Sequence, residues 1–254
     1  MKFNRRETLI LAAAASALSF AGIGAASAAD GDKIDEAKLM APKGVPDHAL
    51  GKDTATVTVI EYASPTCPHC AAFSNDVLPT FLTTYVDSGL VKYILRPFSR
   101  NVLDSAIFML AEAAGPTAYH NVISTYFKTQ GTWGVSDKPR DAIFDVAKQL
   151  GFTQETFDAA LTNQDLFTGI EALRDQAIKD FGLAGTPTFY INGKTLSGEQ
   201  SLAQLAAEID PLLPAGTAPA APAAVDGAMS APSTEPAVTP VAPAETSTPV
   251  VPAK

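Results

Sequence analysis

The sequence predicts an α/β fold in which a βαβ unit and a ββα unit are separated by an all-helical insertion. Three observations support this prediction. A β-branched run at 56–62 is followed by a helical pattern and a second apolar run, and strand patterns return at 188–198 around an Asn-Gly pair. Between them, residues 103–181 show only helical periodicity. About 160 residues, 51–210, therefore form the predicted folded domain.

The first half begins with a strand at 56–62, which is too short and too rich in β-branched residues for a helix. Apolar residues then recur at three- and four-residue spacing over 71–85, which predicts an amphipathic helix. Pro79 lies inside this pattern and should kink the helix. A second strand at 90–96 follows, and a right-handed crossover would make it parallel to the first.

The predicted insertion, at about 102–181, contains five helical patterns separated by glycine, proline or asparagine. They cover residues 103–114, 118–128, 140–150, 154–161 and 166–181. We expect Asp137 to cap the third helix, with Pro139 in its first turn. Trp133 is interpreted as packing within the insertion, and His48 and His120 as surface or helix-packing residues.

The second half of the domain opens with a strand at 188–191. Asn192-Gly193 then predicts a two-residue hairpin turn into another strand at 194–198, because this pair favours the positive φ angles that such turns need. Apolar spacing over 202–209 predicts a last helix, which should end before Pro211.

Both ends of the chain are predicted to lie outside this domain. Basic residues, an apolar run and Ala26-Ser27-Ala28 give residues 1–28 the pattern of a secretory signal peptide cleaved after Ala28, on either the general or the twin-arginine route. Residues 29–50 form a short N-terminal segment. Residues 211–254 hold ten of the 19 prolines and no aromatic residue, which predicts a disordered tail.

The charge balance excludes one class of partner. Without residues 1–28, 15 Lys and Arg remain against 26 Asp and Glu, a net charge of −11. Phosphate backbones require a basic surface, so the sequence argues against nucleic-acid binding.

Cys67 and Cys70 are the only cysteines of the chain and are separated by Pro68 and His69. A zinc site would need more ligands than the pair and its neighbours supply. Haem attachment needs histidine where the chain has Ala71. A structural disulfide would close so short a loop that it would stabilise the fold little. Thiol redox chemistry is the interpretation that remains.

The position of the pair favours this chemistry. Cys67 falls where the first strand leads into a helix, so its sulfur should face unpaired N–H groups that stabilise a thiolate. Pro68 suits the first helical turn, and His69 adds a donor beside the sulfur. Cys70, further into the helix, would be the resolving thiol.

With Cys67-Pro68-His69-Cys70, the inserted helices and Gly185-Thr186-Pro187 before the hairpin, the chain resembles the thioredoxin-fold thiol-disulfide oxidoreductases, and among them the DsbA-like oxidases. The resemblance covers about residues 51–210. It implies a cis Thr186–Pro187 bond beside the substrate, and a proton-accepting role for Glu61, six residues before Cys67.

The resemblance also implies an activity. We expect a monomeric, periplasmic oxidase without a bound cofactor, which donates its disulfide to reduced envelope proteins and is reoxidised by a quinone-linked membrane partner of the DsbB type. The alternatives are an isomerase or reductase of the same fold and, from another class, a copper-binding or chaperone-like periplasmic protein.

Overall fold

The computed structural model describes residues 29–217 and 219. The predicted signal peptide at 1–28 and the predicted tail beyond residue 219 lie outside the described residues. The described part of that tail begins with a short 3-10 helix, η3 (Asp210–Leu212). Among the described residues, no helix has the length and apolar content needed to cross a bilayer.

The elements follow the predicted order, with short additions. In chain order they are α1 (Glu36–Leu39), β1 (Ala49–Leu50), β2 (Val57–Ala63), α2 (Pro68–Ala72), the π-helical turn η1 (Phe73–Val77), α3 (Leu78–Phe81), the π-helical turn η2 (Leu82–Val86), β3 (Val91–Pro97), α4 (Val102–Ala113), α5 (Tyr119–Lys128), α6 (Gln130–Trp133), α7 (Pro139–Gln149), α8 (Gln154–Thr162), α9 (Gln164–Phe181), β4 (Thr188–Ile191), β5 (Lys194–Ser197), α10 (Leu202–Ile209) and η3.

The five strands form one sheet in the order β1-β3-β2-β4-β5. β2 and β3 are parallel, as predicted, and the other pairs are antiparallel. Asn192 and Gly193 have φ angles of 44° and 82°, which the predicted two-residue hairpin requires. Sequence analysis did not identify β1, because two residues are too few to show a strand period.

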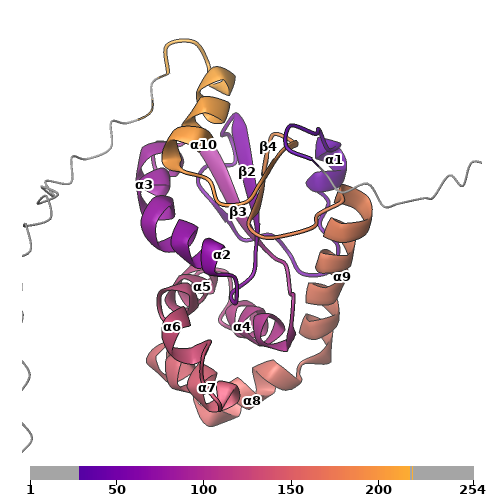
Figure 1. Cartoon of the computed structure of the whole chain (residues 1–254), viewed down its shortest axis with the longest axis vertical. Helices are drawn as coiled ribbons and strands as arrows, with labels where there is room; N and C mark the ends of the chain where they lie inside the picture. Colours follow the sequence, from indigo (N-terminus) through magenta and orange to yellow (C-terminus); the bar gives the residue numbers. More distant parts are fainter. Residues whose placement is uncertain (1–28, 218, 220–254) are drawn as a thin grey trace, which may run out of the picture. The chain divides into compact units, whose positions relative to one another are not determined.

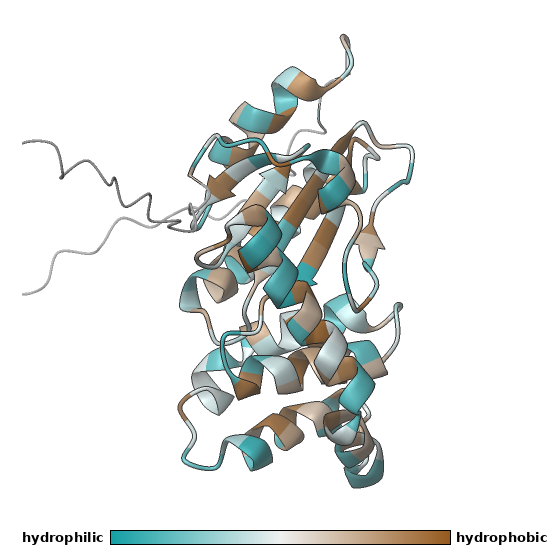
Figure 2. Ribbon diagram, turned by 90° about the vertical axis from the view of Figure 1, so that its right-hand side faces the viewer, coloured by the Kyte–Doolittle hydropathy of each residue, from teal (hydrophilic) through white to brown (hydrophobic). Residues whose placement is uncertain are grey.

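Helices cover the sheet on both sides (Figure 1). α2, α3 and α10 lie on one side of it, and α9, the last helix of the insertion, lies on the other. The remaining helices of the insertion, α4 to α8, gather at the end of the sheet where β2 leads into α2. The central strands are strongly apolar (Figure 2) and almost entirely buried. Burial on both faces explains why their sequences read as continuous apolar runs rather than alternating patterns.

The helix after the cysteines is not a kinked α-helix over 71–85, as the sequence had predicted. It alternates α-helical and π-helical turns, with Pro79 in the first turn of α3. Proline has no N–H to donate to the carbonyl four residues earlier, and a π-turn accommodates that loss by widening the helix locally.

Two predictions about the insertion have different outcomes. Asp137 does not cap α7: the N-cap is Lys138, with Pro139 at the first helical position. The residue before a proline is held out of the helical region, so Lys138 marks the boundary. Trp133 does pack the insertion, since it is fully buried and its Nε1 donates a hydrogen bond to Tyr126 O at 2.8 Å.

Candidate active site

Cys67 is the N-cap residue of α2. Its backbone is extended, with φ −83° and ψ 120°, and Pro68 follows in the first turn. The backbone N–H groups of the first turn have no partner within the helix, and here they face the cysteine sulfur. The local sequence therefore places the thiol where a negative charge is stabilised.

Cys67 is almost completely buried, and its Sγ lies 3.3 Å from Thr186 O. The pKa of Cys67 is lowered to about 5, chiefly because the Cys70 thiol donates a hydrogen bond to its sulfur. Thr186 and the N–H groups of His69 and Cys70 lower this pKa further. At neutral pH the reduced site thus holds a thiolate at Cys67.

Cys70 lies one helical turn further along and has no exposed surface. Burial raises the pKa of its thiol far above the usual range, and the nearby Cys67 and Glu61 raise it further. Both cysteines are free thiols in this structure, which is therefore the reduced state. The pair consists of one thiolate and one thiol that keeps its proton.

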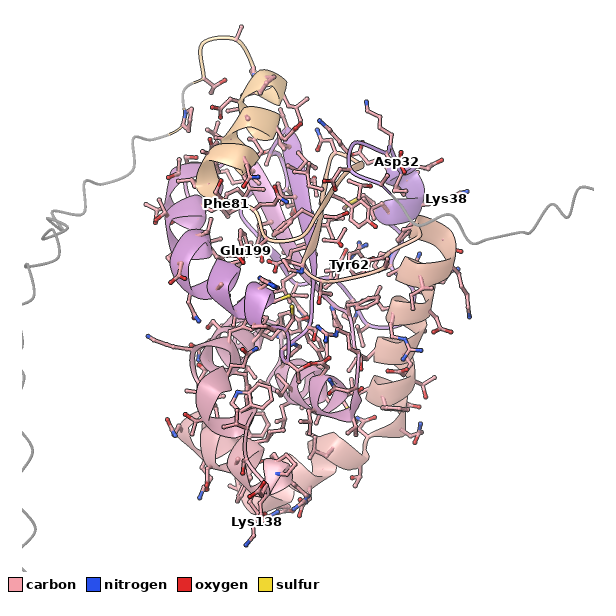
Figure 3. The ribbon with its side chains drawn as sticks, viewed as in Figure 1. Asp32, Lys38, Tyr62, Phe81, Lys138 and Glu199 are labelled. Carbon is pink, nitrogen blue, oxygen red and sulfur yellow. The ribbon has the colours of Figure 1, made fainter. Side chains whose placement is uncertain are left out.

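His69, between the cysteines, points outward and has 69% of its side chain exposed. Its Nδ1 lies 3.0 Å from Glu199 Oε2. Glu199, labelled in Figure 3, lies on the segment between β5 and α10. The exposed imidazole is thus held over the rim of the site by a carboxylate that sequence analysis did not identify.

Glu61 lies near the end of β2 and is 1% exposed. Tyr93 OH donates a hydrogen bond to Oε2, whereas Oε1 has no partner among the described residues. Burial raises the pKa of Glu61 to about 8; the Tyr93 hydrogen bond lowers this pKa, and the charge of Cys67 raises it. Glu61 therefore lies close enough to Cys67 for the charge of its sulfur to raise the pKa of the carboxyl group.

The Thr186–Pro187 peptide bond is cis, as the sequence analysis expected. A cavity of about 310 Å³ lies beside it, lined by the Thr186–Pro187 segment and by residues of β5. The hydroxyls of Thr186 and Thr195 are buried there without a partner among the described residues. An extended chain bound along this segment would pair with its backbone groups rather than with these buried hydroxyls.

Two residues of the insertion form hydrogen bonds with the segment that precedes Cys67. Asp104, fully buried at the start of α4, accepts hydrogen bonds from Thr66 N and Ser64 Oγ, both at 2.8 Å. Gln130 Nε2 donates to Pro65 O at 2.7 Å and to Cys67 O at 3.0 Å. Sequence analysis missed both residues. An aspartate three residues after an asparagine cap is common at a helix start, so its pattern reveals no long-range partner.

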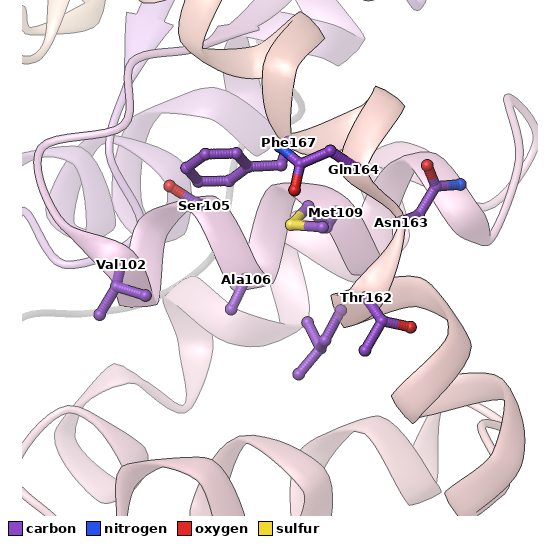
Figure 4. Close-up of a pocket in the computed structure, with 9 residues that line it drawn as sticks. Val102, Ser105, Ala106, Met109, Thr162, Asn163, Gln164 and Phe167 are labelled. Atoms are coloured by element: carbon purple, nitrogen blue, oxygen red, sulfur yellow. The ribbon is translucent and has the colours of Figure 1, made fainter.

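A second cavity, of about 520 Å³, lies in the insertion between α4 and the junction of α8 and α9 (Figure 4). Val102, Met109, Leu161 and Phe167 form much of its wall. None of its lining residues carries a thiol or an acid–base group.

The remaining histidines, His48 and His120, contact each other and Glu112. His48 Nε2 is 2.9 Å from Glu112 Oε2, and His120 Nε2 donates to His48 O at 2.7 Å. These contacts join the N-terminal segment to α4 and α5, which agrees with the helix-packing interpretation. Within the described ranges, no three His, Cys, Asp or Glu side chains are grouped so that they could hold a metal ion.

Comparison with curated proteins finds relatives with similar cores. A Rickettsia bellii protein, provisionally named a protein-disulfide oxidoreductase, is 30% identical over 168 residues, which are 65% of this chain and 63% of that protein. Disulfide bond formation protein D of Bacillus subtilis is 27% identical over 159 residues, 61% of this chain and 70% of that protein. The match thus spans less than two thirds of the length of the Rickettsia relative.

Solved structures of DsbA proteins have a similar fold. A cysteine-to-alanine variant of Wolbachia pipientis α-DsbA1 has a TM-score of 0.65 and 27% identity, and the match covers 70% of this chain and 96% of that one. Oxidised BdbD from Bacillus subtilis, with a TM-score of 0.59, 21% identity and coverage of 74% and 98%, supports the fold alone.

The comparisons agree with the architecture of the sheet and its helices. The family model described as thioredoxin matches residues 43–211, more than half of the sequence. Together with the α/β fold and its inserted helices, this match shows that the chain belongs to the thioredoxin family, with structural neighbours among the DsbA proteins.

Proposed function

We propose that the protein is a thiol-disulfide oxidase that transfers the Cys67–Cys70 disulfide to reduced, unfolded polypeptides. The asymmetry of the two thiols carries this proposal. The pKa of Cys67 is lowered to about 5, while burial raises that of Cys70. A stabilised thiolate makes the reduced state more favourable, and a protein with a favourable reduced state readily gives up its disulfide.

Transfer takes two exchanges. A substrate thiolate attacks Cys67 Sγ, the bond between the cysteines breaks, and Cys70 leaves with the electron pair and becomes protonated. A second substrate thiolate then attacks the substrate sulfur of the mixed disulfide, and Cys67 leaves as a thiolate. Two electrons have passed from the substrate to the cysteine pair, and the substrate holds a new disulfide.

Each surrounding residue has a part in these exchanges. The low pKa of Cys67 makes it the better leaving group in the second step. Glu61, whose pKa is about 8, is protonated at neutral pH and can supply the proton that Cys70 takes up. Pro68 and His69 shape the thiolate site, and the backbone around Thr186 and Pro187 binds the substrate chain.

The reduced pair must be reoxidised before the next cycle. The Cys67 thiolate would attack a disulfide of the oxidant and form a mixed disulfide with it. Cys70 would then give its proton to the Glu61 carboxylate and attack Cys67 Sγ, and the thiolate of the oxidant would leave. We propose that this oxidant is a quinone-linked membrane protein of the DsbB type. We also propose that the chain acts as a monomer in the periplasm after cleavage of residues 1–28, and that it needs no cofactor.

Two cysteine variants test this proposal. With an oxidised, scrambled ribonuclease as substrate, the Cys67 thiolate of Cys70→Ser should attack a ribonuclease disulfide, release one ribonuclease thiolate and accumulate as a mixed disulfide. Cys67→Ser should form almost none, because Cys70 has no exposed surface and keeps its proton. Both products are measured by non-reducing electrophoresis and mass spectrometry. Equal trapping by the two variants would contradict the assigned roles.

Equilibration of the purified protein with glutathione buffers tests the direction of electron flow. An oxidase should have a potential above that of glutathione and should restore ribonuclease activity to reduced, unfolded ribonuclease. A reduction potential near that of thioredoxin, about −270 mV, together with no refolding activity, would mean that the site reduces disulfides instead.

A further inference from the structure

Tyr93 lies beneath the cysteine pair and makes one contact that the proposed mechanism leaves unused. In the parallel pairing of β2 and β3, Val59 is opposite Tyr93 and Glu61 is opposite Leu95. Alternation along a strand therefore puts the Tyr93 and Glu61 side chains on the same face of the sheet. Tyr93 has no exposed surface, and its hydroxyl donates a hydrogen bond to Glu61 Oε2.

This hydroxyl is the one hydrogen-bond donor that Glu61 has among the described residues. The other carboxyl oxygen, Oε1, is buried without a partner. No lysine, arginine or histidine in the described ranges forms a salt bridge with Glu61. A charge on this carboxylate would therefore depend on a single tyrosine for its stabilisation.

The other titratable groups around the pair are few and can be named. Cys67 and Cys70 approach Glu61 from α2 and its cap. The negative charge of Cys67 opposes the ionisation of Glu61, and Glu61 in turn raises the pKa of Cys70, which keeps its proton. From α5, Tyr119 faces Tyr93, and the ring of His120 lies 6.2 Å from the Tyr93 ring. His120 donates its Nε2 proton to a backbone carbonyl, so this proton is not directed at Glu61.

We propose that Tyr93 is a positioning residue of the thiol–disulfide site, which holds the Glu61 carboxylate and sets the pH at which Cys70 can pass its proton to it. The inference rests on the proposed function, in which Cys70 must lose a proton when it displaces the mixed disulfide during reoxidation. Tyr93 touches neither the substrate nor the sulfur atoms in this role and acts through Glu61.

The direction of the effect follows from hydrogen bonding to the charged form. A phenol that donates to a carboxylate stabilises the carboxylate over the acid, which lowers the pKa. At Glu61 this opposes the effect of burial, and the pKa stands at about 8. Without the hydroxyl, no hydrogen bond would oppose the rise in the Glu61 pKa that burial causes. The fraction of Glu61 that is ionised at pH 7, and so able to accept a proton, would fall about tenfold for each unit by which the pKa rises.

Tyr93→Phe is the natural test, because it removes the hydroxyl and keeps the ring that packs at 6.0 Å against Phe81. Tyr85→Phe is the matched control, since the Tyr85 hydroxyl also donates to a carboxylate, Asp210 Oδ1 at 2.8 Å, away from the cysteines. Glu61→Gln identifies the ionisation that belongs to Glu61, because the amide does not titrate.

The first measurement is the rate at which the reduced full-length protein is oxidised by glutathione disulfide between pH 5 and 10. A hydrogen bond to a charged group stabilises it by about 1.5–3 kcal/mol. The midpoint in the pH dependence of the rate that belongs to Glu61 is the one missing in Glu61→Gln. In Tyr93→Phe this midpoint should move up by about one to two pH units. The rate should fall about tenfold or more at pH 7 and recover at high pH, while Tyr85→Phe should match the wild type.

The second measurement needs no activity. The infrared carbonyl band of protonated Glu61, assigned by its loss in Glu61→Gln, should titrate at higher pH in Tyr93→Phe. Replacing all tyrosines by 3-fluorotyrosine, whose hydroxyl is the stronger donor, should move the same band the opposite way in a chain with the natural side-chain shapes. This variant provides the test if Tyr93→Phe does not fold.

A band midpoint unchanged in both Tyr93→Phe and the fluorotyrosine protein would overturn the proposal, as would a rate lowered equally at every pH. Failure of the proposed function would look different. The wild type would then not oxidise the reduced ribonuclease at any pH, while the infrared titration of Glu61 would still report the effect of Tyr93.

Discussion

Glu61 and Asp104 are two buried carboxylates that flank the segment leading into the cysteines, and their surroundings differ. Asp104 accepts hydrogen bonds from Ser64 Oγ, Thr66 N and Arg100 N at 2.8–2.9 Å. Glu61 accepts one, from Tyr93, and its second oxygen has no partner among the described residues. Both oxygens of Asp104 therefore have hydrogen-bond donors from the protein, whereas only one oxygen of Glu61 does.

The difference separates a structural role from a chemical one. The donors around Asp104 replace the water it loses on burial, so the carboxylate can join the insertion to the active-site loop. At Glu61 the replacement is incomplete, and the pKa rises to about 8, within reach of neutral pH. A group that gains or loses a proton near neutral pH is suited to acid–base chemistry.

The largest expected effect comes from the uncompensated burial of Glu61. In the unfolded chain a glutamate titrates near 4.5, and in the folded protein Glu61 titrates at about 8. Between these values the unfolded state has lost a proton that the folded state keeps, so folding stability falls as pH rises. The full loss, reached above pH 8, is about 5 kcal/mol.

Glu61→Gln should abolish this loss, because the amide remains neutral in both states. Urea unfolding under reducing conditions should give similar stabilities for the two proteins near pH 4.5 and a more stable variant at pH 8 to 9. A variant that is equally stable, or less stable, at the higher pH would mean that Glu61 is better solvated than its contacts indicate.

Much of this site follows from local sequence, and the rest depends on the fold. The strand before the cysteines, the helix start at Cys67 and the hairpin at Asn192-Gly193 each follow from a few adjacent residues, and the structure has all three. The resemblance directed attention to Glu61. Its burial beneath the thiols became clear only from the packed sheet.

The residues that sequence analysis missed have partners far along the chain. Tyr93 is 32 residues from Glu61, Asp104 is 38 from Thr66, and Gln130 is 63 from Cys67. A single sequence shows periodicity within an element but not which elements meet. A tyrosine in a strand and a glutamine at a helix start look like ordinary core and surface residues until the fold brings them to the site.

Asp104→Ala should have the next largest effect, this time on stability through lost hydrogen bonds. The substitution leaves two backbone N–H groups and one buried hydroxyl without their acceptor, and each unsatisfied buried group costs about 1–3 kcal/mol. We expect a loss of about 3 kcal/mol or more in the free energy of unfolding, measured with urea at pH 7.

The control for that substitution is Asp158→Ala. Asp158 pairs with Arg140 at the surface, where 45% of its own side chain is exposed, so its loss should cost less than about 1 kcal/mol. Asp104→Asn, which keeps one acceptor oxygen, should fall between the two. If Asp104→Ala were as mild as the surface control, the segment before Cys67 would not depend on the insertion for its conformation.

The smallest expected effect concerns the charge of the Cys67 thiolate, which acts on Glu61. The Cys67 thiolate raises the pKa of Glu61 by repulsion, an influence that ranks below burial and the Tyr93 hydrogen bond. Cys67→Ser removes this negative charge at neutral pH and should lower the midpoint of the Glu61 infrared band by a fraction of a pH unit. Cys70→Ser is the matched control, because burial keeps that thiol protonated and its replacement removes no charge. A midpoint that rose in Cys67→Ser would mean that the sulfur acts on Glu61 through something other than its charge, and the coupling between nucleophile and buried acid would need another physical basis.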